Sequence, residues 1–421
     1  MTYIEFFDKV ASENVSACLT YVPDRVIYIG ENSKLMKKHI ANYERVFKNR
    51  GCNIEFLYRT ICRSNPSDAV RVLSELVEEY DDCIFDITGG EEMYILALGI
   101  VCERHPEKDI RVHMFNLRNN TVYVCSNDGT VSLHEAPMLS IDENVRIYGG
   151  DVVYGNIDEE KTYVWNLDET FLCDLEAIWD VCRYDVKGWN FQSDILRFAE
   201  MLGEVSDDGL TVTVLRNSLE RYVLQHRAKL TESAEIIDYL SKCGLITYFD
   251  DTESGVLTVS YKNAQVKKCI VKAGQALEMK VYTTLLWLAD KDGNPIYNDI
   301  LNGVVIDWDG EFHDGDEIPI VYDTVNEIDI MLMHGVIPVF ISCKNGLVTS
   351  DELYKLETVA ERFGGPYSKK VLVATALDYL GEQGDYLRQR AKDMGIKLIE
   401  NVRDMDDITL ENELAGLWNY S

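Results

Sequence analysis

The sequence lacks a long hydrophobic run, closely spaced cysteine pairs and an excess of basic residues. Its longest strongly apolar run, Met93 to Cys102, is about half the length that spans a bilayer. The opening stretch MTYIEFFDKV carries two acids and no signal-peptide pattern, so we expect a cytoplasmic protein without a membrane segment. The eleven cysteines are scattered and form no C-x-x-C pair, so neither a disulfide framework nor a structural zinc site is supported.

Acidic residues dominate the charge of the chain. Its 421 residues include 41 Lys and Arg against 72 Asp and Glu, which gives a formal net charge of −31. This sign excludes a protein that coats nucleic acid through electrostatics alone, because the phosphate backbone would be repelled. Segment 344–403 carries nearly balanced charges and leaves room for a local nucleic-acid site.

Residues 1–155 alternate between predicted strands and predicted helices. Apolar runs at 25–30, 53–61, 83–88 and 109–117 have the length of buried strands, and helical spacing fills the segments between them. Such alternation is typical of a parallel sheet with right-handed crossovers. A length of 421 residues favours two or three domains, and we predict that the first is a Rossmann-like α/β domain.

Residues 156–270 change to helices followed by two strands around a Ser-Gly turn, at 247–261. Helix, helix and a β-wing are the outline of a winged-helix module. Such a module either recognises DNA or holds two other domains apart. We favour the spacer, because the second helix carries the acids Glu232, Glu235 and Asp238.

Residues 271–421 begin with a helix, continue with a β-meander, and end with helix, strand, helix and strand. This order of elements is typical of the restriction-endonuclease-like α/β core. The meander contains a predicted hairpin at 326–346 with its turn at His334 and Gly335, which places Asp329 opposite about Ile341. Because strand side chains alternate, Ser342 and Lys344 share one face and Cys343 takes the other.

Asp329 and Lys344 are therefore expected to meet at one end of the sheet. A carboxylate that holds Mg²⁺ or Mn²⁺ and a cation that steadies the attacking water are the groups that phosphodiester hydrolysis needs. Glu278, on the first helix of this domain, supplies a second carboxylate, and the backbone carbonyl of Cys343 a third oxygen. The alternative is that Asp329 is a turn acid and Lys344 a solvated charge.

This segment resembles the PD-(D/E)XK nuclease superfamily, whose motif runs acid, spacer, acid, any residue, lysine. Here it reads Asp329, twelve residues, Ser342, Cys343 and Lys344. The resemblance implies a catalytic set of Glu278, Asp329, Ser342 and Lys344, with Glu278, Asp329 and Cys343 as metal ligands. Ser342 departs from the pattern, since a neutral hydroxyl is a poorer ligand than a carboxylate, and Glu278 or Glu357 would have to compensate.

A second informative stretch is the turn Thr88-Gly89-Gly90, which follows a strand and leads directly into a helix. Free backbone N–H groups and the positive helix end at such a turn favour anions. If the strand order reverses nearby, the loop Gly30, Glu31, Asn32 and Ser33 would lie across one crevice from the loop Thr88 to Glu92. Alternatively, the glycines only permit a tight turn, and Glu91 and Glu92 only favour a helix start. No G-x-G-x-x-G is present, so NAD is not expected.

With both ends considered, the chain resembles CRISPR-associated Rossmann-fold (CARF) sensors fused to a PD-(D/E)XK nuclease, which act in type III CRISPR antiviral defence. The resemblance implies a homodimer that binds a cyclic oligoadenylate, with cyclic tetra-adenylate the first choice, and then cuts DNA, RNA or both with Mg²⁺ or Mn²⁺. Gly30 to Ser33 and Thr88 to Glu92 would line the ligand site, although a lysine often follows the T-G-G turn in that family. The alternative function is a ligand-responsive regulator with an inactive nuclease fold; degradation of the ligand by the sensor is left open.

Overall fold

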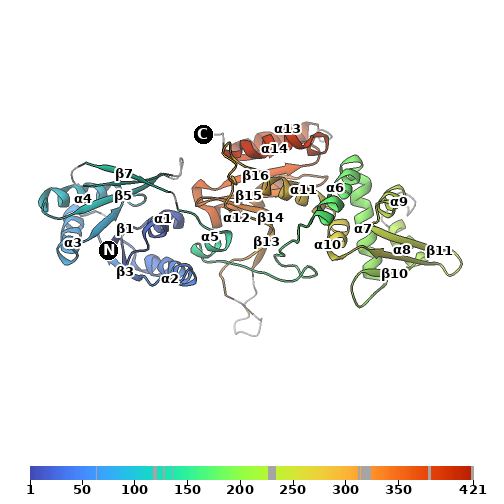
Figure 1. The fold of residues 1–421 in the computed structure, drawn as a ribbon, viewed down its shortest axis with the longest axis horizontal. Coiled ribbons are helices and arrows are strands. Elements are labelled where there is room, and N and C mark those ends of the chain that lie inside the picture. The colour runs from blue at the N-terminus through green and yellow to red at the C-terminus, as the bar shows by residue number, and fades with distance from the viewer. Residues whose placement is uncertain are drawn as a thin grey trace.

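Three sheets lie in a row along the molecule. The computed structural model describes residues 1–418 except 63, 117–120, 127–128, 136, 226–233, 312, 314–323 and 378–380. The N-terminal sheet lies at one end, the C-terminal sheet in the middle, and the small sheet of the middle segment at the other end (Figure 1). The C-terminal sheet therefore has a neighbour on each side. Within the described residues, no helix is long and apolar enough to cross a membrane.

The N-terminal domain is Rossmann-like, as predicted. Its strands are β1 Thr2–Phe6, β2 Arg25–Gly30, β3 Glu55–Thr60, β4 Cys83–Asp86, β5 Ile110–Asn116, β6 Thr121–Cys125 and β7 Val131–His134. Its helices are α1 Ala11–Tyr21, α2 Ser33–Asn49, α3 Pro66–Glu79, α4 Glu92–Arg104 and α5 Ile141–Ile147. The sheet has the order β3-β2-β1-β4-β5-β6-β7, with β1 to β5 parallel and the last two strands antiparallel. Helices α3 and α4 pack on one face, and α1 and α2 on the other.

Strand β1 was not expected from the sequence, and it changes the geometry of the predicted crevice. Glu5 interrupts the apolar pattern of this strand, yet its side chain is fully buried. β1 lies between β2 and β4, so the strand order reverses between β1 and β4. The loops after β2 and β4 therefore flank the residues that follow β1, at the edge where the strand order reverses.

The middle segment combines helices with a four-stranded antiparallel sheet. Its elements are α6 Glu169–Tyr184, α7 Val186–Leu202, β9 Glu204–Val205, β10 Thr211–Leu215, α8 Arg216–Gln225, α9 Ala234–Lys242, β11 Ile246–Asp251, β12 Val256–Tyr261 and α10 Ala264–Val271. The predicted two-stranded wing corresponds to β11 and β12, and the hairpin of β9 and β10 extends it to the order β11-β12-β10-β9. The sequence predicts one of the helices of this segment over 217–230; α8 is described as far as Gln225, and the remainder of that range lies outside the described residues.

The C-terminal domain is built on a mixed sheet of six strands. Its elements are α11 Gln275–Leu286, β13 Asp299–Asp307, β14 Val325–His334, β15 Ile337–Lys344, α12 Ser350–Gly364, the short 3-10 helix η2 Gly365–Tyr367, β16 Lys369–Ala374, α13 Glu382–Asp393, β17 Ile396–Ile399 and α14 Asp407–Ala415. The sheet order is β17-β16-β15-β14-β13-β8, where β8, Asp151–Val152, comes from the segment after α5.

Both faces of this sheet are buried, and each face shares a core with a different part of the molecule. Met331, Phe340 and Leu372 belong to a cluster that continues through α5 and α12 into the N-terminal domain. Ile330 and Ile341, on the other face, belong to a cluster that includes α6, α7, α10 and α11. The central sheet therefore packs against both the N-terminal domain and the middle segment.

The hairpin register differs from the expected one by a single residue. His334 pairs with Ile337, so the turn consists of Gly335 and Val336 rather than His334 and Gly335. Gly335 has a φ of 64°, a conformation that glycine adopts without strain. Ile330 therefore pairs with Ile341, which places Asp329 beside Ser342.

Candidate active site and sensor loop

The carboxylate of Asp329 is the centre of the candidate active site. Its Oδ2 accepts hydrogen bonds from the Ser342 hydroxyl at 3.1 Å and from the Cys343 backbone N–H at 2.6 Å. The Lys344 Nζ lies 3.5 Å from the same oxygen. The structure thus brings together three of the four predicted catalytic side chains, Asp329, Ser342 and Lys344, at the end of the hairpin.

These three side chains line a cavity of about 250 Å³ between the hairpin and α12. Cys343 points the other way: its side chain is 3% exposed and belongs to the core on the opposite face of the sheet. Burial, followed by the nearby Asp329, raises the pKa of the Cys343 thiol well above its usual range, so the thiol is not a thiolate ligand. The predicted metal ligand at this position is the backbone carbonyl oxygen, not the thiol.

Glu278 does not line this cavity. It is 3% exposed on α11, and its Oε2 has no hydrogen-bond partner in the described part of the chain. Burial, and then the charge of Asp329, raise the pKa of Glu278 to about 8, while Lys272 and Lys344 act in the opposite direction. Glu278 is thus electrostatically close to Asp329 and Lys344 although it approaches from behind the cavity.

Four charged residues that the sequence analysis did not single out complete the site. Glu352, in the first turn of α12, lies 3.1 Å from Lys344 and 3.0 Å from Lys355. Lys272 lies 2.6 Å from Glu327 and 3.8 Å from Glu278. A usable signal was the start of a predicted helix six residues after Lys344, since its first turn must lie near the end of β15.

Glu357 does not take the place of the missing acid. It forms an ion pair with Lys370, whose strand lies on the far side of β15 from β14. Glu352 and Glu357 are five residues apart, which on a helix places them on different sides, and only Glu352 lines the cavity. The expectation that Glu357 supports the site is therefore wrong.

The donor set is compatible with a divalent cation that takes few protein ligands. Among the described residues, no group of three or more His, Cys, Asp and Glu side chains is close enough to hold a metal by itself. Mg²⁺ commonly takes one or two carboxylates and completes its shell with water and substrate phosphate. Asp329 and the buried Glu278, whose Oε2 has no hydrogen-bond partner among the described residues, are two such carboxylates.

The T-G-G turn after β4 is shaped by its neighbours. The Thr88 N–H donates to Asp86 Oδ1 at 2.7 Å, and the Thr88 hydroxyl accepts from the Phe115 N–H at 2.8 Å. Gly90 has a φ of 90°, and a Cβ there would lie 2.5 Å from Phe6 Cβ. The second glycine is therefore required by the fold, whether or not a ligand binds.

The loop after β2 is separated from this turn by the residues that follow β1. A Cβ on Gly30 would lie 3.3 Å from Phe7 Cβ, and one on Gly89 would lie 2.9 Å from Asp8 Cβ. The side chain of Asn32 caps α2 by accepting from the Leu35 N–H at 3.0 Å, and Ser33 begins that helix. Asp8 and the exposed Lys9 are thus candidates for the ligand site that the sequence analysis missed.

The predicted acids Glu91 and Glu92 lie at the start of α4, but neither caps the helix with its side chain. Glu91 stands at the N-cap position with no side-chain capping hydrogen bond, and Glu92 is the first residue of the helix. Glu31, after β2, is exposed. All three predicted acids lie at the carboxyl edge of the sheet, where open α/β sheets bind ligands: Glu31 and Glu91 just before a helix and Glu92 at its first position.

Glu13, on α1, connects the T-G-G turn to the C-terminal domain. A Cβ on Gly89 would lie 3.0 Å from Glu13 Oε2, and Glu13 Oε1 accepts a hydrogen bond of 2.7 Å from the Tyr367 hydroxyl. Tyr367 ends η2, which directly follows α12. Burial raises the pKa of Glu13 to about 7, against the hydrogen bond from Tyr367. One buried carboxylate thus contacts both the predicted sensor loop and the helix that carries Glu352.

Comparison with known proteins identifies the architecture. No family model and no curated protein sequence matches the chain. The crystal structure of VC1899 from Vibrio cholerae matches 100% of this chain and 97% of its own length, with a TM-score of 0.70 at 16% identity. Can2 from Sulfobacillus thermosulfidooxidans, solved in complex with cyclic tetra-adenylate, matches 99% of this chain and 97% of its own, with a TM-score of 0.63 at 16% identity. This chain has the Can2 fold.

The match to Can2 and VC1899 spans all three parts of the chain. The predicted resemblance is thereby confirmed at the level of the fold, from the N-terminal parallel sheet to the C-terminal mixed sheet. A type III CRISPR defence DNA nuclease activated by cyclic oligoadenylate matches 89% of this chain but 45% of its own length, with a TM-score of 0.46 at 14% identity, too low to support an inference.

Proposed function

We propose that this protein is a metal-dependent nuclease that a cyclic oligoadenylate switches on, in type III CRISPR defence. The observation that carries the proposal is the meeting of Asp329, Ser342 and Lys344 around one cavity in a chain with the Can2 fold. Cyclic tetra-adenylate is the first activator to test because Can2 was solved with it. The protein would act in the cytoplasm as a homodimer, since a ligand with two-fold symmetry suits a two-fold axis between subunits.

Asp329 and Glu278 would hold Mg²⁺ or Mn²⁺, with the Cys343 carbonyl as a further oxygen. The ion would supply Lewis-acid stabilisation of the phosphate and a water of lowered pKa. Burial by itself lowers the pKa of Lys344, but Asp329 and Glu352 outweigh it and raise that pKa, so Lys344 stays charged. A charged Lys344 would orient the attacking water and stabilise the negative charge that develops on the phosphate.

The regulator alternative rests on a specific observation as well. Ser342 stands where an acid is usual, and Asp329 already receives two hydrogen bonds and an ion pair. In this arrangement Lys344 balances the negative charge of Asp329 without a metal ion. The regulator therefore remains the second candidate function, and nuclease activity decides between the two.

A cleavage assay separates the two functions. Supercoiled plasmid and single-stranded RNA are incubated with the protein, Mn²⁺ or Mg²⁺, and cyclic oligoadenylates of several ring sizes. We expect cutting that needs both the metal and one ring size, and a loss of about a hundred- to a thousandfold in Lys344→Ala, as for other transition-state donors.

Lys242→Ala is the matched control, because Lys242 is a 79% exposed lysine on α9, far from the cavity in sequence. Normal cutting by Lys344→Ala would assign the activity to another site or a contaminant. No cutting by the wild type with any ring, metal or substrate would promote the regulator.

A further inference from the structure

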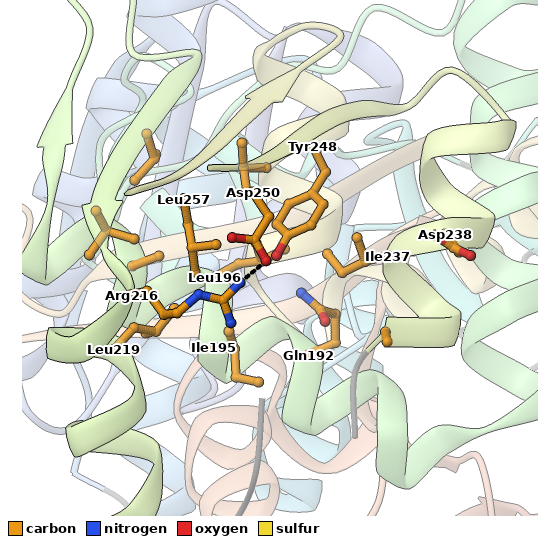
Figure 2. A pocket seen from close by; sticks show the side chains of 15 residues that line it. Gln192, Ile195, Leu196, Arg216, Leu219, Ile237, Asp238, Tyr248, Asp250 and Leu257 are labelled. Atoms are coloured by element: carbon orange, nitrogen blue, oxygen red, sulfur yellow. Dashed lines mark ion pairs between the residues drawn. The ribbon is translucent and has the colours of Figure 1, made fainter. Parts of the chain in front are cut away.

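Helix α7 presents different side chains to its own segment and to the C-terminal domain. On one side, Ile195 and Leu196 line an apolar pocket of about 260 Å³ between the helices and the small sheet of the middle segment (Figure 2). On another side, the Trp189 indole N–H donates to the backbone carbonyl of Ala273, just before α11, at 3.0 Å. The first turn of α7 is therefore fixed to the chain that enters the C-terminal domain.

Asn190, the next residue of α7, bonds to the residue that directly follows Lys344. Its Nδ2 donates to the backbone carbonyl of Asn345 at 2.7 Å, and its Oδ1 accepts from Asn345 Nδ2 at 2.9 Å. Asn345 Nδ2 also donates to the Ala273 carbonyl at 3.1 Å. Two half-buried asparagines that are 155 residues apart in the sequence thus hold each other at the end of β15.

Gly346 allows α7 to approach this closely. A Cβ on Gly346 would lie 2.8 Å from Asn190 Nδ2, and its φ of 117° also favours glycine. The Gly346 N–H donates to Thr375 Oγ1 at 3.1 Å, and the Thr375 N–H donates to the Lys344 carbonyl at 3.1 Å. The main chain over 344–346 is therefore held by the neighbouring strand on one side and by the middle segment on the other.

We propose that Asn190 is a positioning residue for Lys344, which makes the middle segment part of the nuclease site. With the main chain held by Asn190 and Thr375, the Lys344 Nζ keeps its place 3.5 Å from Asp329 and 3.1 Å from Glu352. Placement matters, because a displacement of about 1 Å can cost about a hundredfold in rate. This role rests on the proposed nuclease function, whereas the hold on the end of β15 is measurable without cutting.

Asn190→Asp removes one hydrogen bond and keeps the shape of the side chain. The carboxylate still accepts from Asn345 Nδ2, but it cannot donate to the Asn345 carbonyl and repels that oxygen. We expect kcat to fall about tenfold or more, with KM and Mn²⁺ affinity within about twofold of the wild type, because only the placement of Lys344 changes. Asn217→Asp, at an exposed position of α8, is the matched control and should cut normally.

A double variant separates positioning from simple cohesion between the two parts. Residual cutting by Lys344→Ala is measured with the protein in excess over the nucleic acid, and Asn190→Asp is then added to it. If Asn190 acts through Lys344, the second substitution should change this residual rate by less than about twofold, because the group that it positions is absent. A further loss as large as that in the wild type would overturn the proposal, since the amide pair would then only hold the parts together.

Hydrogen exchange tests the hold on β15 without any cutting. Peptides that contain Cys343 to Gly346 should exchange about two- to tenfold faster in Asn190→Asp, the factor expected for one lost hydrogen bond, and peptides from 325–334 should not change. Unchanged exchange at Cys343 to Gly346, or an unchanged kcat in Asn190→Asp, would overturn the role of Asn190. A wild type that cuts no substrate while this exchange rises would refute the proposed nuclease function, and with it any role of Asn190 in cutting.

Discussion

Removal of one hydroxyl, in Tyr367→Phe, should uncouple the sensor from the nuclease. The Tyr367 hydroxyl donates to Glu13, and Glu13 contacts Gly89 of the predicted sensor loop. Helix α12 has 15 residues, so at 1.5 Å per residue it extends about 22 Å from the Tyr367 end to the Glu352 end. A ligand that moves the T-G-G turn would therefore act on the partner of Lys344 through one rigid element.

The size of the effect follows from this hydrogen bond. A hydrogen bond to a charged acceptor contributes about 1.5–3 kcal/mol, and allosteric coupling energies are typically of the same size, about 1–3 kcal/mol. If the bond forms in only one of the two states, its loss changes the activation ratio by roughly tenfold or more. Basal cutting without activator should change little, because the hydroxyl lies at the opposite end of α12 from Lys344.

The assay compares cutting with and without cyclic tetra-adenylate at pH 8, where Glu13 is mostly ionised. Tyr354→Phe is the matched control, since Tyr354 is a 48% exposed tyrosine on the same helix that does not contact the N-terminal domain through its hydroxyl. Wild-type activation in Tyr367→Phe would refute the role of α12. Equal loss in both variants would show that any change in this helix has the same effect.

Three further predictions test separate parts of the structure. Gly90→Ala should destabilise the protein by more than about 1 kcal/mol and weaken activator binding, because Gly90 has a φ of 90° and a Cβ there would clash with Phe6. Gly99, on α4, has open space around it, so Gly99→Ala should stabilise the protein by about 0.5–1 kcal/mol. Chemical denaturation measures both changes. Ser342→Asp should lower the melting temperature without metal, by repulsion from Asp329, and Mn²⁺ should restore it; no response to Mn²⁺ would contradict a metal site. The folded-state pKa of Glu13 is raised from 4.5 to about 7, so the folded state binds the proton more tightly than the unfolded state does. The free energy of unfolding of the wild type should therefore fall as the pH rises from 4.5 to 7, by at most about 3 kcal/mol from this group. Chemical denaturation at pH 5 and pH 8 should show that Glu13→Gln lacks this part of the fall.

The sequence was sufficient where the pattern was local. The helix and strand order from α11 to β17, and the side-chain alternation of Ser342, Cys343 and Lys344, follow from apolar spacing and agree with the structure, whereas β8 and α14 were not predicted. The register differed by one residue because the position of the two-residue turn depends on which residue takes a positive φ, and Gly335 takes the first rather than the second central position.

The elements that were missed contain polar residues whose burial depends on distant contacts. Glu5 interrupts the apolar pattern of β1, which is why the sequence did not predict this strand. Burial and then Asp86 raise the pKa of Glu5 well above the usual range, so the carboxyl group is protonated and is tolerated in the core. Gln192 reads as an ordinary polar residue of a helix, and only the assembled pocket shows that its amide is enclosed. No sequence period signals such positions, because the partners come from other elements.

The shared cores limit how a signal can travel through the molecule. One cluster joins the N-terminal domain, α5, α12 and one face of the central sheet, so the N-terminal domain cannot move freely against that face without exposing apolar side chains. Close-packed interiors transmit displacement instead of absorbing it. The cluster on the other face of the C-terminal sheet extends through α6, α10 and α11 to residues of α7. The two faces of the sheet that carries Asp329 and Lys344 therefore belong to two different hydrophobic clusters, one continuous with the N-terminal domain and one with the middle segment.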